Sequence, residues 1–255
     1  MSTTSATTSS PNRSTTSTGV DSVAVDEHGH TVAGMFDAIA DRYDVMNLVM
    51  TWGQEPRLIR RTVAAARLPQ APAVLDLAAG TGDLAFAVLS RYYGAEITAC
   101  DIAPEMMAVG AARPGGDQIS WVQADAMDLP FADHSFDAVT HGYLLRNVTD
   151  ISATLDEQFR VLKPGGWMAA LEMSPAPRNV LKPFSTAYIT WAVPRIASWI
   201  TDNPEAYEYL SRTSRGFHPP QVIQRMAHEA GFRSTGYELH MFGTMAIHWG
   251  QKPLD

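Results

Sequence analysis

A strand-like apolar run leads directly into a turn of small residues, and this turn carries the strongest chemical signal in the sequence. The run Val74-Leu75-Asp76-Leu77 is followed by Ala78-Ala79-Gly80-Thr81-Gly82-Asp83. The two glycines let the backbone approach a ligand where a Cβ atom would collide. A helix that begins after the turn directs its N–H groups at the same ligand. We therefore predict a nucleotide-like ligand at this turn. Its candidate contact residues are Asp76, Ala78, Gly80, Thr81 and Gly82.

The glycine turn alone fits more than one ligand. Gly80-x-Gly82-x-x-Ala85 also satisfies the loose dinucleotide-binding pattern, so a nicotinamide-dependent enzyme is a rival interpretation. A tight strand–helix turn without any ligand is another. A dehydrogenase more often repeats a second mononucleotide-binding half, and none is visible in the sequence.

Two carboxylates follow the next two strand-like runs. Asp101 ends the second run, where it can accept both ribose hydroxyls or cap the helix that follows. Asp125 follows the third run, where it can bind an adenine edge or serve as a turn residue. Their neighbours Ile102 and Ala126 complete the candidate cofactor site.

Strand-like and helical segments alternate around these residues. Strands are expected at Ala73–Leu77, Glu96–Cys100, Ile119–Gln123, Phe136–Thr140 and Trp167–Met173, with closing strands at about Ser234–Met241 and Gly243–Gly250. Helices are expected at Met35–Met50, Pro56–Ala66, Asp83–Tyr93, Pro104–Ala111, Ile151–Leu162 and Pro220–Ala230. This alternation predicts an α/β fold with a mostly parallel sheet and helices on both faces.

The composition narrows the classes of protein. The chain has 255 residues, of which 45% are hydrophobic, enough for one domain with a buried core. Its net charge of -8 argues against binding nucleic acid, which requires clustered Lys and Arg. The single cysteine, Cys100, excludes a disulfide framework and fits a reducing cytoplasm. We expect no metal site, because the His, Asp and Glu residues lack a convincing ligand spacing.

The ends and the middle of the chain differ in character. Residues 1–30 include a Ser/Thr-rich stretch and are expected to form a disordered tail, followed by one domain over 31–255. No uninterrupted apolar run of about 18 residues indicates a membrane span, so we expect a cytoplasmic protein. Residues 175–221 form a long insertion rich in aromatic residues and prolines.

Three segments, in this order, resemble one enzyme family. They are Tyr43–Thr51, Leu145–Asp150, and Arg160–Gly166 continued through Leu171–Ser174. The chain resembles the ubiquinone/menaquinone C-methyltransferase family over roughly residues 33–252. The resemblance implies a class I methyltransferase fold, Rossmann-like, with a seven-stranded sheet whose final strand is antiparallel. It also implies S-adenosyl-L-methionine as the cofactor.

The family places a methyl group on a ring carbon of a prenylated quinol, such as demethylmenaquinol, and the resemblance implies this reaction here. Arg146 is then the candidate for stabilising the phenolate, although it can also pair with Asp150. Asn147 would hold a quinol oxygen, with a structural role as a cap as the alternative. Tyr43 would close the site from the N-terminal helix, with a place in the core as the alternative. His218 and His248 are candidate proton acceptors, with a structural role as the alternative.

The insertion at 175–221 would suit a lid over a flat ring with a prenyl tail, or ordinary packing against the sheet. Its residues in question are Phe184, Tyr188, Trp191, Ile196, Trp199 and Ile200. A lid of this kind would allow a peripheral contact with the inner face of the membrane. A homodimer is the expected assembly if the chain associates.

Several positions depart from the family pattern. Thr51, Glu55 and Leu58 stand where a Ser, a His and a Trp are usual, and Leu144 replaces a glycine. Gly216–Pro220 is altered as well. These departures leave two alternatives open. One is a paralogue that methylates another aromatic or prenylated metabolite. The other is a non-catalytic, cofactor-binding subunit of a quinone-pathway complex.

Overall fold

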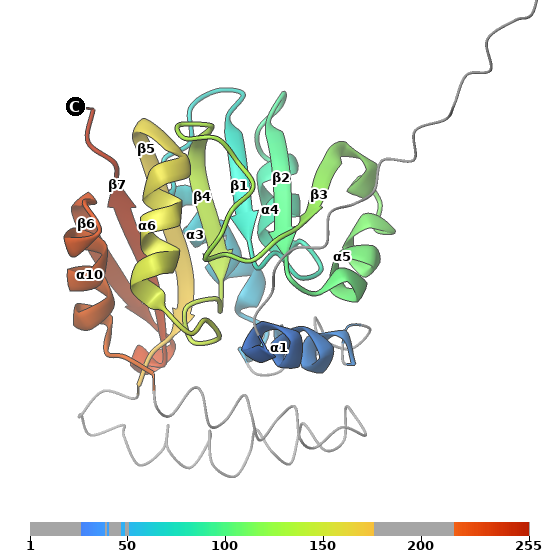
Figure 1. Ribbon diagram of the computed structural model, residues 1–255, viewed down its shortest axis with the longest axis horizontal. Helices are drawn as coiled ribbons and strands as arrows, with labels where there is room; N and C mark the ends of the chain where they lie inside the picture. Colours follow the sequence, from blue (N-terminus) through green and yellow to red (C-terminus); the bar gives the residue numbers. More distant parts are fainter. Residues whose placement is uncertain (1–26, 39, 41–46, 49–50, 176–216, 255) are drawn as a thin grey trace, which may run out of the picture.

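A seven-stranded sheet forms the centre of the protein, in a computed structural model that describes residues 27–38, 40, 47–48, 51–175 and 217–254. The strands are β1 (Ala73–Leu77), β2 (Glu96–Asp101), β3 (Ile119–Gln123), β4 (Phe136–Gly142), β5 (Leu162–Met173), β6 (Arg233–His240) and β7 (Met245–Gln251). They lie in the order β3-β2-β1-β4-β5-β7-β6 (Figure 1). Strands β1 to β5 pair in parallel, whereas β7 is antiparallel to both of its neighbours. The expected sheet, with its antiparallel final strand, is confirmed.

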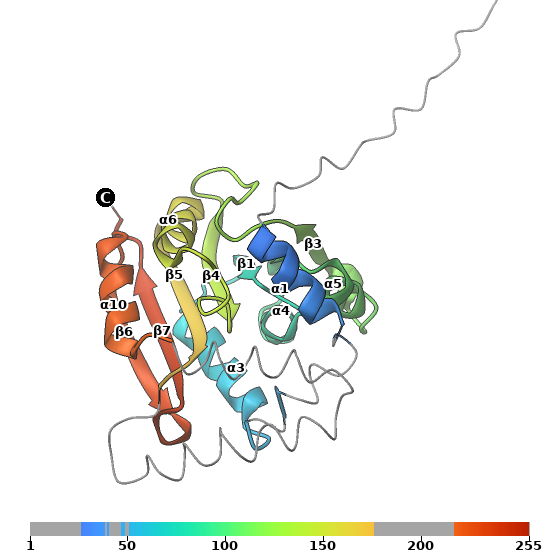
Figure 2. The same cartoon turned by 60° about the horizontal axis from the view of Figure 1, so that its bottom comes forward.

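Helices cover both faces of the sheet (Figure 2). They are α1 (Glu27–Asp37), α3 (Glu55–Ala65), α4 (Asp83–Leu89), α5 (Pro104–Ala111), α6 (Ile151–Val161) and α10 (Pro220–Glu229). Along β1, Leu75 and Leu77 are buried in the core beneath α6 and α10. Val74 faces the other way and packs against α3 and α4. This alternation along one strand makes the sheet the middle layer of three.

The N-terminal helix differs from the expected one. The helix predicted over Met35–Met50 is wrong in its N-terminal bound, because α1 starts at Glu27 and ends at Asp37, whereas residues 39, 41–46 and 49–50 of the predicted stretch lie outside the described residues. Ala33 and Phe36 pack against α5, so the apolar spacing that suggested a helix continues toward the N-terminus. The Asp37 carboxylate accepts hydrogen bonds from the first backbone N–H groups of α5, which ties the end of α1 to that helix.

Some predictions fall on residues that the structure leaves undescribed. Tyr43 and the expected lid residues of the insertion lie outside the described residues, as does most of the expected tail. Within the described ranges, no helix is long and apolar enough to span a membrane.

Candidate functional site

A pocket of about 780 Å³, including the space open to solvent at its mouth, lies at the carboxyl ends of β1, β2 and β4. Of the predicted cofactor residues, it brings together Ala78, Gly80, Asp101, Ile102, Asp125 and Ala126. The sequence did not single out other lining residues, among them Val32, Phe36, Met106, Met127 and Tyr143. Most of these are apolar, and apolar residues are too common along the chain to signal a site by type alone.

The turn after β1 has the backbone that its composition predicts. Gly80 and Gly82 have φ angles of 56° and 89°, in the left-handed region. A Cβ atom on Gly82 would lie 2.7 Å from Trp121, so this glycine is required for packing. Gly82 lines none of the described pockets, and its contact with a ligand stays a prediction. Ala78 also has a positive φ, 48°, at a position that glycine would occupy without strain.

Asp76 is buried beneath the same turn. Its carboxylate accepts hydrogen bonds from the Thr140 hydroxyl (2.8 Å) and from the backbone N–H of Ala85 (3.0 Å). Burial raises the pKa of Asp76 to about 7, although both hydrogen bonds oppose this shift. Asp76 therefore holds β1, β4 and the start of α4 together at the edge of the site.

The other two carboxylates also shape the pocket. Asp101 accepts hydrogen bonds from the backbone N–H groups of Gly80 (2.7 Å) and Ala103 (2.9 Å). Burial raises the pKa of Asp101, while these hydrogen bonds lower it. Asp125 accepts a hydrogen bond from the backbone N–H of Met127 (2.9 Å), which makes it a turn residue that also lines the pocket.

A second pocket, of about 440 Å³ including open space, adjoins the first. Ala78, Gly80, Gly142 and Tyr143 line both pockets. The second pocket also contains two predicted residues that the first lacks, Asp76 and Thr81. Its remaining wall includes Asn47 and Glu55, which connect the N-terminal part of the chain to the glycine turn.

The segment after β4 carries the predicted catalytic residues. Leu144 and Asn147 line the first pocket, and the Asn147 amide donates a hydrogen bond to the backbone oxygen of Tyr143 (2.7 Å). Arg146 is half-buried, lines none of the described pockets, and lies with its guanidinium 5.9 Å from the centre of the Tyr143 ring. Asp150, its alternative partner, accepts hydrogen bonds from two backbone N–H groups and caps α6.

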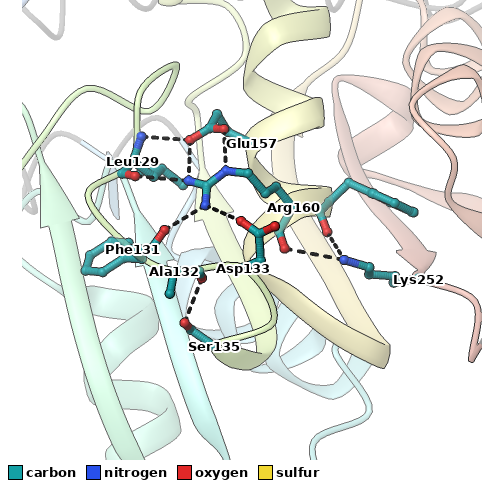
Figure 3. A network of polar contacts seen from close by, with 9 residues as sticks. Leu129, Phe131, Ala132, Asp133, Ser135, Glu157, Arg160 and Lys252 are labelled. Atoms are coloured by element: carbon teal, nitrogen blue, oxygen red, sulfur yellow. Dashed lines mark hydrogen bonds and ion pairs between the residues drawn. The ribbon is translucent and has the colours of Figure 1, made fainter.

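Arg160 stabilises the loop that follows Asp125. In the sequence it is part of the family segment Arg160–Gly166, where no role was predicted for it. The Arg160 guanidinium donates hydrogen bonds to the backbone oxygens of Leu129 (3.0 Å) and Phe131 (2.7 Å). It also pairs with Glu157 and Asp133 (Figure 3). Glu157 in turn accepts a hydrogen bond from the Leu129 backbone N–H (2.8 Å). The loop that follows the pocket wall is thereby held against α6.

The two candidate proton acceptors lie away from the pockets. His248 is 2% exposed, and burial lowers its pKa to about 3. His248 on β7 pairs with Ala170 on β5, and Ala170 pairs with His141 on β4, so the two histidines lie on either side of Ala170 on the same face of the sheet. His218 is exposed and lines none of the described pockets. For His248 the structure favours the structural alternative. Among the described residues, no group of three or more His, Cys, Asp or Glu side chains could hold a metal ion.

The pocket suits an adenosyl group, because two carboxylates stand among apolar side chains beside a glycine turn. Together with this strand order and the family match given next, it defines a class I S-adenosylmethionine-dependent methyltransferase. The model of the ubiE/COQ5 methyltransferase family matches residues 23–252, and the chain belongs to this family.

Two curated relatives cover nearly the whole chain. The ubiquinone/menaquinone biosynthesis C-methyltransferase UbiE of Desulfotalea psychrophila is 45% identical over 224 residues, which are 88% of this chain and 91% of that protein. The demethylmenaquinone methyltransferase of Thermus thermophilus is 40% identical over 222 residues, which are 86% of this chain and 100% of that protein.

Solved structures share the fold at much lower identity. Haemonchus contortus phosphoethanolamine N-methyltransferase 2 in complex with S-adenosyl-L-methionine aligns with a TM-score of 0.67 and 15% identity, covering 90% of this chain and 61% of that one. The [4+2]-cyclase SpnF aligns with a TM-score of 0.69 and 18% identity, covering 91% of this chain and 99% of that one. Because a cyclase shares the fold, the fold alone does not select the reaction.

Proposed function

We propose that this enzyme transfers a methyl group to a ring carbon of a prenylated hydroquinone, and that demethylmenaquinol is the acceptor. The observation that carries the proposal is one pocket that is lined by two sets of residues. Asp101 and Asp125 come from the segments after β2 and β3, whereas Leu144 and Asn147 come from the segment after β4. The names of the curated relatives support a quinol as the second ligand.

One group of residues binds the methyl donor and another binds the quinol that accepts the methyl group. Asp101 accepts the ribose hydroxyls, and Asp125 with the Ala126 backbone binds the adenine edge. The cofactor supplies an electrophilic methyl group when it is bound. Asn147 holds a quinol oxygen. Arg146 stabilises the phenolate that makes the neighbouring ring carbon nucleophilic, from a position beside the pocket, where its guanidinium lies 5.9 Å from the ring of the lining residue Tyr143. Arg146 suits this role because its guanidinium keeps its charge at any physiological pH.

Replacing Arg146 tests the assignment of the residues that act on the quinol. Arg146→Lys keeps a positive charge but loses the planar fork, so we expect turnover to fall at least about tenfold. Affinity for S-adenosylhomocysteine should stay near wild type, since Arg146 is not among the residues proposed to bind the cofactor. The measurement is single turnover with labelled cofactor and a panel of quinols. Full activity of Arg146→Lys would contradict the proposed role.

Two finer proposals concern the setting of the reaction. A prenylated acceptor partitions into a bilayer, which supports peripheral contact of this enzyme with the membrane surface. Co-flotation with vesicles that contain menaquinone tests the contact, and recovery of all the protein in the soluble fraction would contradict it. We keep a homodimer as a prediction, to be tested by sedimentation.

A further inference from the structure

A buried carboxylate on β5 takes no part in the proposed transfer and lies outside both described pockets. Glu172 belongs to the family segment Leu171–Ser174 and is 0% exposed. Burying a carboxylate destabilises a fold unless hydrogen bonds or an opposite charge compensate for the lost water. The groups that Glu172 contacts therefore indicate what it does for the protein.

Two groups meet one oxygen of this carboxylate. Glu172 accepts at Oε1 a hydrogen bond from the backbone N–H of Leu145 (2.8 Å). The same Oε1 lies 3.4 Å from Nδ1 of His141 on β4, whose side chain is also 0% exposed. The imidazole gives the buried carboxylate a polar neighbour, and Leu145 is the residue that Glu172 holds in place.

Leu145 is part of a tight turn after β4. The backbone N–H of Asn147 donates to the backbone oxygen of Leu144 (2.8 Å), so Leu145 and Arg146 are the central residues of a β-turn. Such a turn leaves the N–H of its first central residue without a partner inside the turn. Leu145 is 1% exposed, so this N–H group is shielded from water. The Glu172 carboxylate supplies the acceptor that the turn lacks.

Strand β5 holds the same turn at a second point. The backbone N–H of Tyr143 donates to the backbone oxygen of Leu171 (2.8 Å). Tyr143 has a φ angle of 59°, in the left-handed region, at the point where the chain leaves β4. Leu171 by its backbone and Glu172 by its side chain thus fix the start of the turn. In this position the turn brings Leu144 and Asn147 into the wall of the first pocket.

We propose that Glu172 is a positioning residue for the methyl acceptor, because it anchors the turn Leu144–Asn147 through the N–H group of Leu145. The turn carries the two side chains that the proposed function assigns to the quinol, so this inference rests on that function. The carboxylates proposed to bind the cofactor come from the segments after β2 and β3. Loss of the anchor therefore displaces the groups that act on the quinol and leaves the cofactor site in place.

Two neutral substitutions of similar size separate the anchor from the charge. Glu172→Gln keeps an oxygen that can accept from the Leu145 N–H group, whereas Glu172→Met keeps the length of the side chain without that acceptor. With labelled S-adenosylmethionine and demethylmenaquinol, Glu172→Met should lower kcat about 10- to 100-fold, the size expected when reacting groups are misplaced by about 1 Å. Glu172→Gln should keep kcat within about threefold of wild type. Affinity for S-adenosylhomocysteine should stay within about twofold of wild type in both variants.

Asp137 on β4 provides a matched control. Its carboxylate also accepts a hydrogen bond from a backbone N–H group, that of Ala73 (2.8 Å), but Asp137 lines none of the described pockets. Asp137→Leu should lower the melting temperature and leave kcat within about twofold of wild type. A loss of kcat as large as that in Glu172→Met would overturn the inference, because any weakened anchor of the sheet would then slow the transfer.

The two Glu172 variants can also contradict the inference by themselves. Wild-type kcat in Glu172→Met would rule out the anchor. An equal loss of kcat in Glu172→Gln and Glu172→Met would do the same, because the charge and not the acceptor oxygen would then matter. A loss of affinity for S-adenosylhomocysteine in proportion to the loss of kcat would show a general structural role in place of a positioning one.

Hydrogen exchange on the unaltered chain keeps the test independent of how the variants fold. The Leu145 amide should exchange at least about 100-fold more slowly than in an unstructured peptide, because its N–H group is hydrogen-bonded to Glu172 and buried. Exchange at the unstructured rate would sink the inference while leaving the proposed function intact. If wild type bound S-adenosylhomocysteine but methylated no quinol, the proposed function would fail first, even with a protected Leu145 amide.

Discussion

At the scale of single residues, Asp101 combines two positions that the sequence offered as alternatives, in the pocket wall and at a turn. It lines the first pocket, where we propose that the ribose binds, and its carboxylate also accepts hydrogen bonds from the backbone N–H groups of Gly80 and Ala103. The same side chain thus shapes the glycine turn and lines the pocket proposed for the cofactor. A substitution here should change both the affinity for the cofactor and the stability of the fold.

We expect Asp101→Asn to weaken S-adenosylhomocysteine binding by about 1.5–3 kcal/mol, because one acceptor oxygen becomes a donor. The melting temperature should fall as well, since Gly80 or Ala103 loses its partner. Calorimetry and thermal denaturation measure the two effects. Asp128→Asn is the control, as Asp128 is exposed and lines none of the described pockets. Unchanged affinity together with tight binding of NAD would contradict the assignment.

Leu144 lines the first pocket at a position where the family pattern has a glycine. It is 5% exposed and packs into the core. If its isobutyl group hinders demethylmenaquinol, Leu144→Gly should raise turnover on that quinol at a cost of about 2–5 kcal/mol in stability. Leu145→Ala, in the core but outside the described pockets, should cost similar stability without that gain.

The wild-type enzyme decides between the two substrate hypotheses. If demethylmenaquinol is the acceptor, the chain should complement a strain that lacks this methylation step. A folded, cofactor-binding chain that fails to complement, and gains activity on the quinol with Leu144→Gly, would instead indicate a paralogue with another acceptor.

At the scale of elements, α6 acts as the support for the loop beyond the pocket wall. Arg160, in the last turn of α6, binds two backbone oxygens and two carboxylates of its surroundings. The loop from Leu129 to Asp133 has few regular backbone hydrogen bonds of its own, so this side chain replaces them. The geometry depends on the planar fork of the guanidinium group.

Arg160→Lys should therefore destabilise the protein by about 2 kcal/mol, because one ammonium group cannot reach all of these acceptors. Thermal denaturation and calorimetry with S-adenosylhomocysteine measure the loss and its effect on the pocket. Lys163→Arg is the control, because Lys163 pairs with one carboxylate only, that of Asp137, and either cation can form such a pair. Equal stability of Arg160→Lys and wild type would rule out this support.

At the scale of the whole molecule, two buried titratable groups give stability opposite dependences on pH. Burial raises the pKa of Asp76 from 3.8 to about 7, so its contribution is complete below about pH 4 and is lost as the pH rises through 7. Burial lowers the pKa of His248 from 6.5 to about 3, so its neutral form stabilises the fold above the usual pKa and loses this effect in acid. Stability should therefore be greatest at intermediate pH.

Asp76→Asn tests the alkaline side of this profile. The difference in unfolding free energy between wild type and Asp76→Asn should shrink by about 2 kcal/mol from about pH 5 to about pH 8, since ionised Asp76 costs the native state. Urea denaturation at the two pH values measures it. His248→Gln should show the opposite sign, with its largest advantage over wild type in acid. A difference that is constant with pH would contradict the assignment to Asp76.

The sequence by itself determined the strands of the sheet and the glycine turn after β1, because both arise from local patterns. The bounds of β1, β3 and α5 agree with the expected ones, since each is an apolar run ended by a turn or proline signal. The positive φ angles of Gly80 and Gly82 follow from residue type in the same way. The position of Asp101 and Asp125 in one pocket was predictable as well, because parallel strands bring the residues that follow them to one edge of the sheet.

Only the tertiary structure decided which distant residues meet. Glu55 comes to lie beside Asp76 because α3 packs on the sheet next to α4, and Arg160 reaches a loop about 30 positions earlier in the chain. Likewise, the pairing of β4, β5 and β7 sets His248 opposite His141, and His248 lines neither of the described pockets. Periodicity records which face of an element is buried, but the register of strands and the packing of helices determine what that face touches.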